Sequence, residues 1–320
     1  MDETTLYPRH AEASLVEALA DSPAVLIHGP RQSGKSTLAK KVGAARGYAY
    51  ISFDEDVARA AAGADPAGFL ADLPGRSTLD EIQHVPALFA AMKAAIDRDR
   101  SPGRFILTGS ANVLLLPKLA DSLAGRMEIV RLHPLAQSEL GRKRSGFIDS
   151  LFTGKFKTRR VDRLGAELAE KITSGGYPAA LARQSGRRRA AWYQNYLVTL
   201  VQRDVRELAR IRSLDALPRL LSAAASQTAR LFNVSDLAAP FQLSRPTIRD
   251  YLTLLEQVFL LETLPPWHSN RLSRLVKTPK LHIGDSGLAC ALLSVDTAAL
   301  VADRSLLGQL FETFVFQELR

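Results

Sequence analysis

The most informative segment of this chain is Gly29-Pro30-Arg31-Gln32-Ser33-Gly34-Lys35-Ser36-Thr37, which matches the phosphate-binding pattern G-x-x-x-x-G-K-[ST] at every fixed position. An apolar run rich in strand-forming residues precedes it, from Ala24 to His28, and a run suited to a helix follows it, from Leu38 to Val42. Strand, glycine-containing loop and helix in this order are the context in which the pattern binds phosphate. We therefore expect a phosphate-binding loop rather than an ordinary turn with a surface lysine.

The residue types in this loop suit a nucleoside triphosphate. Gly29 and Gly34 let the backbone curl tightly and approach an anion without a Cβ in the way. The loop N–H groups and the helix N-terminus then point at the phosphates. Lys35 places a compact cation on the outer phosphates, and the Ser36 hydroxyl can bind Mg²⁺. Thr37 supports the first helical turn or contacts an inner phosphate.

An acidic pair follows in the segment Ser77-Thr78-Leu79-Asp80-Glu81-Ile82-Gln83-His84. At the end of a short strand, Asp80 would hold Mg²⁺ through water, and Glu81 would orient and polarise the attacking water. The residues before Asp80 are polar where aliphatic residues are usual, and an Asp-Glu pair is also common as a helix cap. Because a phosphate loop precedes the pair, we favour the catalytic interpretation.

A further buried strand, Arg104 to Leu107, runs into the polar turn Thr108-Gly109-Ser110. Ligands of a parallel sheet bind at the carboxyl ends of its strands. Thr108 or Ser110 is therefore expected to sense the terminal phosphate or the water, with a simple turn residue as the alternative.

Two arginines have competing interpretations. Arg126 precedes a fifth apolar strand, Glu128 to Leu132, and is a candidate arginine finger that acts within the chain or on a neighbouring copy. A salt-bridged surface arginine is the alternative. Arg9, in an expected lead-in helix, either reaches the nucleotide base or lies in solvent.

Composition sets broad limits on the protein. Its 320 residues are enough for two or three domains, and 46% hydrophobic with 23% charged residues is ordinary for a globular protein. The net charge of +9 suits a polyanionic partner such as nucleic acid, but genome composition explains the charge equally well.

The cellular compartment is indicated by what the sequence lacks. The one cysteine, Cys290, excludes an internal disulfide and fits a reducing cytosol. The N-terminal residues are acidic rather than apolar, and no uncharged apolar run of ~18 residues occurs. We expect a cytoplasmic protein with no signal peptide and no membrane span.

Together these motifs resemble a bacterial and archaeal family of AAA-type ATPases, distantly similar to origin-recognition ATPases, in which a domain of unknown function follows the ATPase core. The first half carries the resemblance in Gly-Pro-Arg-Gln-Ser-Gly-Lys-Ser-Thr-Leu (29–38), Leu-Asp-Glu-Ile-Gln (79–83), Leu-Thr-Gly-Ser (107–110), Ser-Leu-Ala-Gly-Arg (122–126) and His-Pro-Leu (133–135). Further matches are Gly-Gly-Tyr-Pro (175–178), Gln-Arg-Asp-Val (202–205), Lys-Thr-Pro-Lys (277–280), Asp-Ser-Gly-Leu (285–288) and Leu-Phe-Glu-Thr-Phe-Val (310–315). The resemblance implies a five-stranded parallel sheet with the loop on a central strand, and ATP with Mg²⁺ as ligands.

Residues 217–264 have winged-helix character. We expect helices from Leu217 to Ala229, from Leu237 to Phe241 with Ser235-Asp236 as its cap, and a third capped by Ser244 with Pro246 in its first turn, followed by a wing strand from Phe259 to Leu264. In a DNA-reading module, Arg245, Thr247 and Arg249 on the third helix would face the groove. Winged helices also dock proteins, so a protein partner remains the alternative.

After Pro265-Pro266-Trp267 the chain resembles the opening of a restriction-nuclease-like fold, with a strand from Leu281 to Ile283 running to Asp285, and Glu312 in a helix. Metal nucleases of that class need a further acidic residue and a Glu-x-Lys strand. No such segment follows before Arg320, so we expect a C-terminally truncated fragment in which the two acidic residues cap and pair.

The sequence thus predicts an α/β fold. Its expected parts are an AAA-type P-loop NTPase domain (1–140), a basic helical connector (141–212), a winged-helix domain (213–267) and the start of a nuclease-like α/β segment (268–320). The expected function is Mg²⁺-dependent ATP hydrolysis coupled to DNA or a protein partner through the winged helix, with a homo-oligomer left open. The alternatives are a slow nucleotide-switched regulator or toxin–antitoxin-type component, and the ATPase part of a DNA-processing nuclease.

Overall fold

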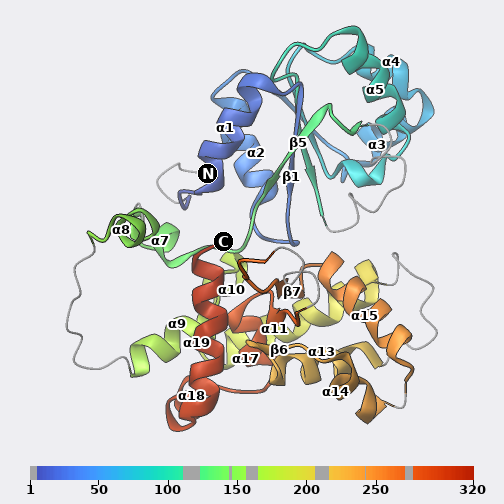
Figure 1. Ribbon diagram of the computed structural model, residues 1–320. Helices are drawn as coiled ribbons and strands as arrows, with labels where there is room; N and C mark the ends of the chain where they lie inside the picture. Colours follow the sequence, from blue (N-terminus) through green and yellow to red (C-terminus); the bar gives the residue numbers. More distant parts are fainter. Residues whose placement is uncertain are drawn as a thin grey trace. The chain divides into compact units, whose positions relative to one another are not determined.

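The computed structural model divides the chain into two compact units, Met1–His133 and Pro134–Arg320 (Figure 1). The described residues are 6–110, 123–143, 146–155, 165–205, 216–241, 243–270 and 277–320. Part of the basic connector lies outside them, namely Arg144, Lys157, Arg159 and Arg160. The finer division of the second unit into three domains stays a prediction. Among the helices described, none is long and apolar enough to cross a membrane.

The first unit is built on a five-stranded parallel sheet, as expected, with strand order β2-β3-β4-β1-β5. The strands are β1 (Ala24–His28), β2 (Ala49–Ser52), β3 (Ser77–Asp80), β4 (Phe105–Gly109) and β5 (Met127–Arg131). The strand that leads into the phosphate loop, β1, lies between β4 and β5. The loop therefore leaves the sheet from an interior strand.

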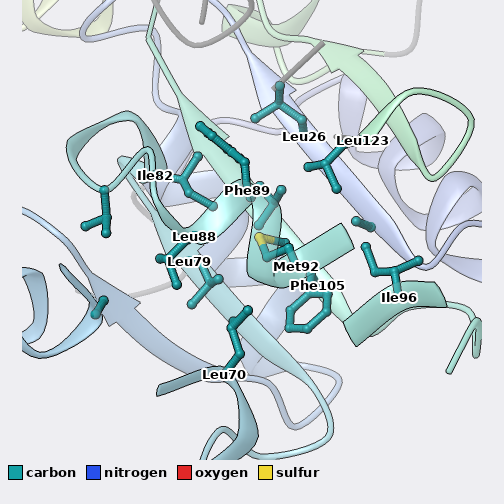
Figure 2. Close-up of a cluster of buried hydrophobic side chains, with 14 of the residues drawn as sticks. Leu26, Leu70, Leu79, Ile82, Leu88, Phe89, Met92, Ile96, Phe105 and Leu123 are labelled. Carbon is teal, nitrogen blue, oxygen red and sulfur yellow. The ribbon is translucent and has the colours of Figure 1, made fainter. Parts of the chain in front are cut away.

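Helices cover both faces of this sheet (Figure 1). They are α1 (Ala11–Asp21), α2 (Lys35–Ala44), α3 (Asp56–Ala64), α4 (Pro66–Ala71), the 3-10 helix η2 (Ile82–His84) and α5 (Leu88–Arg98). Because successive side chains of a strand point to opposite faces, Val25 and Ile27 pack in the cluster of α1 and α2, whereas Leu26 packs in the cluster of α5. Figure 2 shows Met92 of α5 and Phe105 of β4 in the second cluster.

The polar residues of β3 lie in the interior of the first unit. Ser77 and Thr78 are buried, and the Ser77 hydroxyl donates a hydrogen bond to the Pro74 carbonyl over 3.1 Å. A Cβ added to Gly43 of α2 would lie 2.8 Å from the Thr78 hydroxyl oxygen. The lack of a side chain at Gly43 therefore lets α2 approach β3 closely at Thr78.

The second unit combines helices with a three-stranded antiparallel sheet of order β6-β8-β7. Its strands are β6 (Arg230–Leu231), β7 (Leu261–Leu264) and β8 (Lys280–Ile283). The first helices are α7 (Gln137–Leu140), α8 (Phe147–Thr153), α9 (Ala166–Ser174), α10 (Pro178–Leu181) and α11 (Arg187–Leu200), which continues into the π-helical turn η4 (Val201–Val205). The later ones are α13 (Ala216–Ser226), α14 (Val234–Ala238), η5 (Ala239–Phe241), α15 (Arg245–Gln257), α17 (Ser286–Leu292), α18 (Thr297–Ala302) and α19 (Arg304–Glu318).

Two expected helix caps have different outcomes. The cap of α15 is confirmed, because the Ser244 hydroxyl accepts a hydrogen bond from the Thr247 N–H over 3.3 Å. The cap expected at Ser235-Asp236 is wrong. The helix α14 begins at Val234, three residues before the expected Leu237, so Ser235 lies inside the helix. The Asn233 side chain accepts a hydrogen bond from the Ser235 N–H over 3.0 Å.

The acidic residues that resembled a nuclease site have structural partners. Asp285 is buried and accepts hydrogen bonds from the N–H groups of Gly176 (2.7 Å) and Leu288 (2.9 Å), the latter at the start of α17. Glu312 forms an ion pair with Lys280. Within the described ranges, no group of three or more His, Cys, Asp or Glu side chains could hold a metal ion.

Candidate nucleotide-binding site

The loop between β1 and α2 needs glycine at its two ends. A Cβ on Gly29 would lie 2.1 Å from the carbonyl oxygen of Leu132, which follows β5. Gly34 has φ of 99°, a left-handed conformation that glycine adopts without strain, and it precedes the first helical residue, Lys35. Gly29 therefore lets the loop pass close to the backbone that follows β5, and Gly34 lets the chain turn into α2.

Lys35 is held across this loop. Its side chain is buried, and Nζ donates hydrogen bonds to the carbonyls of Gly29 over 3.1 Å and Pro30 over 2.9 Å. The first-turn N–H groups of a helix have no partner within the helix and attract anions. The structure thus combines a buried cation with the N-terminus of α2, where the hydroxyl-bearing Ser36 also lies. This is the donor and charge pattern that a triphosphate requires.

Arg9 contacts the loop from the segment before α1. One guanidinium nitrogen donates to the Ser33 carbonyl over 2.7 Å and the other to the His133 carbonyl over 2.5 Å. The side chain therefore joins the phosphate loop to His133, two residues after the end of β5. Neither of the two interpretations from sequence, a base contact or a solvent-exposed side chain, includes this contact.

Asp80 ends β3 and is fixed from the strands on both sides. Its Oδ1 accepts a hydrogen bond from the Thr108 hydroxyl of β4, and its Oδ2 accepts one from the Tyr50 hydroxyl of β2, each over 2.6 Å. The pKa of Tyr50 is raised, mainly because the side chain is buried and secondly because its hydroxyl is hydrogen-bonded to Asp80. The phenol therefore stays protonated and donates to the carboxylate.

Glu81 lies next to Asp80 in an unusual backbone conformation. Its φ of 55° is in the left-handed region, which is uncommon for a residue other than glycine and typical of functional sites. The Glu81 N–H donates to the Thr108 hydroxyl over 2.9 Å. The Glu81 carboxylate accepts a hydrogen bond from the Gln83 amide, which also donates to the Ser110 hydroxyl over 3.2 Å. The structure thus brings Glu81 and Ser110 together through Gln83.

The oxygen atoms at this edge fit a magnesium ion. A carboxylate has roughly four acceptor positions, and Asp80 uses two of them for Tyr50 and Thr108. The remaining positions can accept hydrogen bonds from metal-bound water. Mg²⁺ prefers oxygen ligands, keeps several waters and is usually bound with substrate phosphates. The Ser36 hydroxyl and Asp80 are a donor set of this kind.

Arg126 lies away from these residues, at the amino end of β5. Met127 is paired with Ala24 at the start of β1, whereas the phosphate loop follows His28 at its end, about 13 Å further along the strand. Arg126 forms a two-point ion pair with Asp97, with Nε–Oδ1 at 2.7 Å and Nη2–Oδ2 at 2.9 Å. These hydrogen bonds raise the pKa of Arg126 and lower that of Asp97. An arginine-finger role within the same chain is therefore not supported by this geometry, and action on a neighbouring copy stays a prediction.

In the second unit, the residues expected to read DNA lie in the first turns of α15. Arg245 and Arg249 are exposed and four residues apart, so they share one helix face. Thr247 is partly buried, and its hydroxyl bonds the Ser244 hydroxyl over 2.8 Å. The two arginines are thus available at the surface, whereas Thr247 takes part in the helix cap.

Two residues of the site are given no role by the sequence: Gln83, although it lies in the segment 79–83, and Tyr50, which lies outside every motif. Tyr50 lies two residues before Ser52, which pairs with Asp80 in the register of β2 and β3. Diagonal neighbours on adjacent strands are within reach of a long side chain. Once the strand order is known, this spacing is the signal that finds Tyr50.

Comparisons with known proteins agree with the geometry. An AAA domain family matches residues 21–141, and a domain of unknown function (DUF8612) matches residues 165–299. Two uncharacterised proteins, one from Mycobacterium bovis and one from Mycobacterium tuberculosis, are 32% identical over 312 residues. The alignment covers 97% of this chain, which spans 65% of the length of each relative.

A solved structure shares the fold. The Walker-type ATPase of Pyrococcus abyssi superimposes with a TM-score of 0.57 at 18% identity, covering 91% of this chain and 97% of that chain. At this level of identity the likeness concerns the fold alone. The family match over residues 21–141 and this shared fold support an AAA-type P-loop ATPase domain in the first unit of the chain.

Proposed function

We propose that this protein binds and hydrolyses ATP with Mg²⁺ at the carboxyl edge of the parallel sheet. The observation that carries the proposal is the arrangement at this edge. The loop with the buried Lys35 follows β1, and Asp80, Glu81 and Ser110 lie at the ends of the strands β3 and β4. Phosphoryl transfer depends on positioning and charge stabilisation, which these groups are suited to provide.

Each residue has a separate role in this proposal. The loop N–H groups and Lys35 bind the outer phosphates, while Ser36 and Asp80 hold the metal ion, which neutralises charge on the phosphates when bound. Glu81 orients the attacking water as a general base. Ser110, which shares the Gln83 amide with Glu81, lies where it can contact that water or the terminal phosphate.

Steady-state ATP hydrolysis tests this function. Lys35→Ala should abolish turnover by removing the phosphate-binding cation. Glu81→Gln should abolish turnover but still bind ATP, because only water activation is lost. Wild-type turnover that equals that of Lys35→Ala would reject the proposal.

We further propose that nucleotide state is coupled to DNA through a winged helix in the second unit. The order α13-β6-α14-α15-β7-β8, with β8 between β6 and β7 in the antiparallel sheet, supports a winged-helix module. This module includes β8 and so extends past residue 267, the end predicted from the sequence, into the segment expected to be nuclease-like. In this module α15 is the third helix, with Arg245 and Arg249 exposed. The net charge of +9 is consistent with a polyanionic partner. ATP turnover that changes when duplex DNA is added would support coupling, and equal turnover would contradict it.

A second candidate function, a slow nucleotide-switched regulator, is favoured by the contact between Gln83 and Glu81. A carboxylate oxygen that already accepts a hydrogen bond from an amide has fewer acceptor positions left for the attacking water. ATP would then act mainly as a ligand that changes the state of the second unit. ATP that stays bound and intact through purification, with negligible turnover even with DNA, supports this candidate over a fast ATPase.

A further inference from the structure

We propose that Tyr50 is a positioning residue that orients Asp80 for the magnesium ion, a role that rests on the proposed ATPase function. Motif patterns point to the loop and the acidic pair, whereas Tyr50 lies on a different strand, β2. Its hydroxyl donates to Asp80 Oδ2 over 2.6 Å.

The carboxylate of Asp80 is clamped between two strands. Tyr50 of β2 donates to one oxygen, and Thr108 of β4 donates to the other, so a rotation of the carboxylate breaks both hydrogen bonds. Asp80 is buried, at 3% exposure, and bulk water does not readily replace a missing donor. Carboxylates that bind metal ions are oriented by such outer hydrogen bonds, whose removal typically weakens metal affinity.

Tyr50 also connects the acidic strand to the helix of the phosphate loop. Lys40 of α2 places Nζ 4.2 Å from the centre of the Tyr50 ring, within the range of a cation–π interaction. A cation on the ring face withdraws electron density from the phenol and strengthens its O–H as a donor. The ring therefore lies between α2 and Asp80, and Lys40 is expected to support the same orientation more weakly.

Tyr50→Phe isolates the hydroxyl, and Tyr48→Phe is its matched control. The Tyr48 hydroxyl donates to the backbone carbonyl of Gly103 over 2.5 Å, so its removal costs a hydrogen bond without touching Asp80. The experiment titrates a fluorescent ATP analogue into each full-length variant, first in EDTA and then at increasing Mg²⁺ concentration. Binding is the readout, so the test does not depend on turnover.

Tyr50→Phe should bind the analogue as the wild type does in EDTA, because the loop is intact. It should need about tenfold more Mg²⁺ for half of the metal-dependent gain in affinity. Tyr48→Phe should keep the wild-type Mg²⁺ requirement. Lys40→Gln, at an exposed position, should raise the required Mg²⁺ concentration about two- to threefold. It is a second test that leaves the tyrosine itself unchanged.

Asp80→Asn distinguishes a failure of the Tyr50 positioning role from a failure of the proposed metal site. If Asp80→Asn abolishes the gain from Mg²⁺ while Tyr50→Phe and Lys40→Gln keep the wild-type requirement, the positioning role is wrong and the nucleotide site stands. If the wild type gains no affinity from Mg²⁺, or Asp80→Asn gains as much as the wild type, the proposed metal site itself is wrong and the role of Tyr50 falls with it.

Discussion

The side-chain amide of Gln83 bridges the Glu81 carboxylate and the Ser110 hydroxyl at the ends of two adjacent strands. Gln83→Ala removes this bridge. We expect kcat for ATP to rise by roughly two- to tenfold with KM unchanged, because a hydrogen bond contributes roughly 0.5–1.5 kcal/mol net and its removal frees the carboxylate to accept a hydrogen bond from water. Steady-state kinetics across ATP concentration measures both parameters.

Ser110→Ala is the control for Gln83, since it removes one partner of the amide and leaves the contact with Glu81 in place. Because Ser110 is itself placed to contact the attacking water or the terminal phosphate, Ser110→Ala should not raise kcat as Gln83→Ala does. A Gln83→Ala variant as inactive as Glu81→Gln would contradict the restraining role and show that the amide positions the base.

Gly29→Ala should destabilise the first unit. The added Cβ would lie 2.1 Å from the Leu132 carbonyl oxygen, so the loop or the end of β5 must shift. Overpacking of this kind costs typically ~1–3 kcal/mol of unfolding free energy. Urea unfolding followed by circular dichroism measures the change. Gly75→Ala, where an added Cβ meets nothing within 4 Å, should leave the stability near that of the wild type.

Stability should depend on Glu318 between about pH 4.5 and pH 7. Burial raises the pKa of Glu318 from 4.5 to about 7. The folded state therefore binds more protons than the unfolded state across this window, and the unfolding free energy falls as the pH rises through it. The side chain is partly solvated, so the expected decrease is about 1–2 kcal/mol after screening.

Glu318→Gln should flatten this part of the pH profile, measured by urea unfolding at several pH values. Glu312→Gln is the matched control, because Glu312 lies on the same helix and pairs with Lys280 at the surface. Equal slopes for the wild type and Glu318→Gln would show that another group titrates in the window.

DNA affinity should depend on the exposed arginines of α15. Arg245→Ala and Arg249→Ala, each made singly, should weaken binding to duplex DNA and reduce the slope of log affinity against log salt by roughly one for an arginine that neutralises a phosphate. Fluorescence anisotropy at several salt concentrations measures both effects. Arg188→Ala, an exposed arginine of α11, controls for the change in net charge. Unchanged affinity in the α15 variants would exclude this helix as the DNA-binding element.

The sequence predicts the elements of the first unit well where burial decides them. The run from Ala24 to His28 is buried on both faces of the sheet, and the strand has the bounds that the apolar run predicts. The polar strand before Asp80 is a weaker prediction, because the close approach of Gly43 to Thr78 is a tertiary contact that no local pattern shows.

The candidate site is predictable only as far as its motifs reach. Asp80 and Glu81 follow from the pattern, but Tyr50 depends on the register of β2 with β3, and the position of Arg126 depends on the pairing of β5 with β1. The predicted cap of α14 is wrong for a similar reason. Asn233 and Ser235 are both good caps by type, and the start of α14 decides between them.

The central claim is that a nucleoside triphosphate binds in the loop between β1 and α2. A crystal structure with a non-hydrolysable ATP analogue and Mg²⁺ tests it most directly. We predict the outer phosphates on the loop N–H groups, with Lys35 Nζ turned from the Pro30 carbonyl to a phosphate oxygen and the metal ion between Ser36 and Asp80. A phosphate chain bound elsewhere, with the Lys35 hydrogen bonds unchanged, would contradict the account.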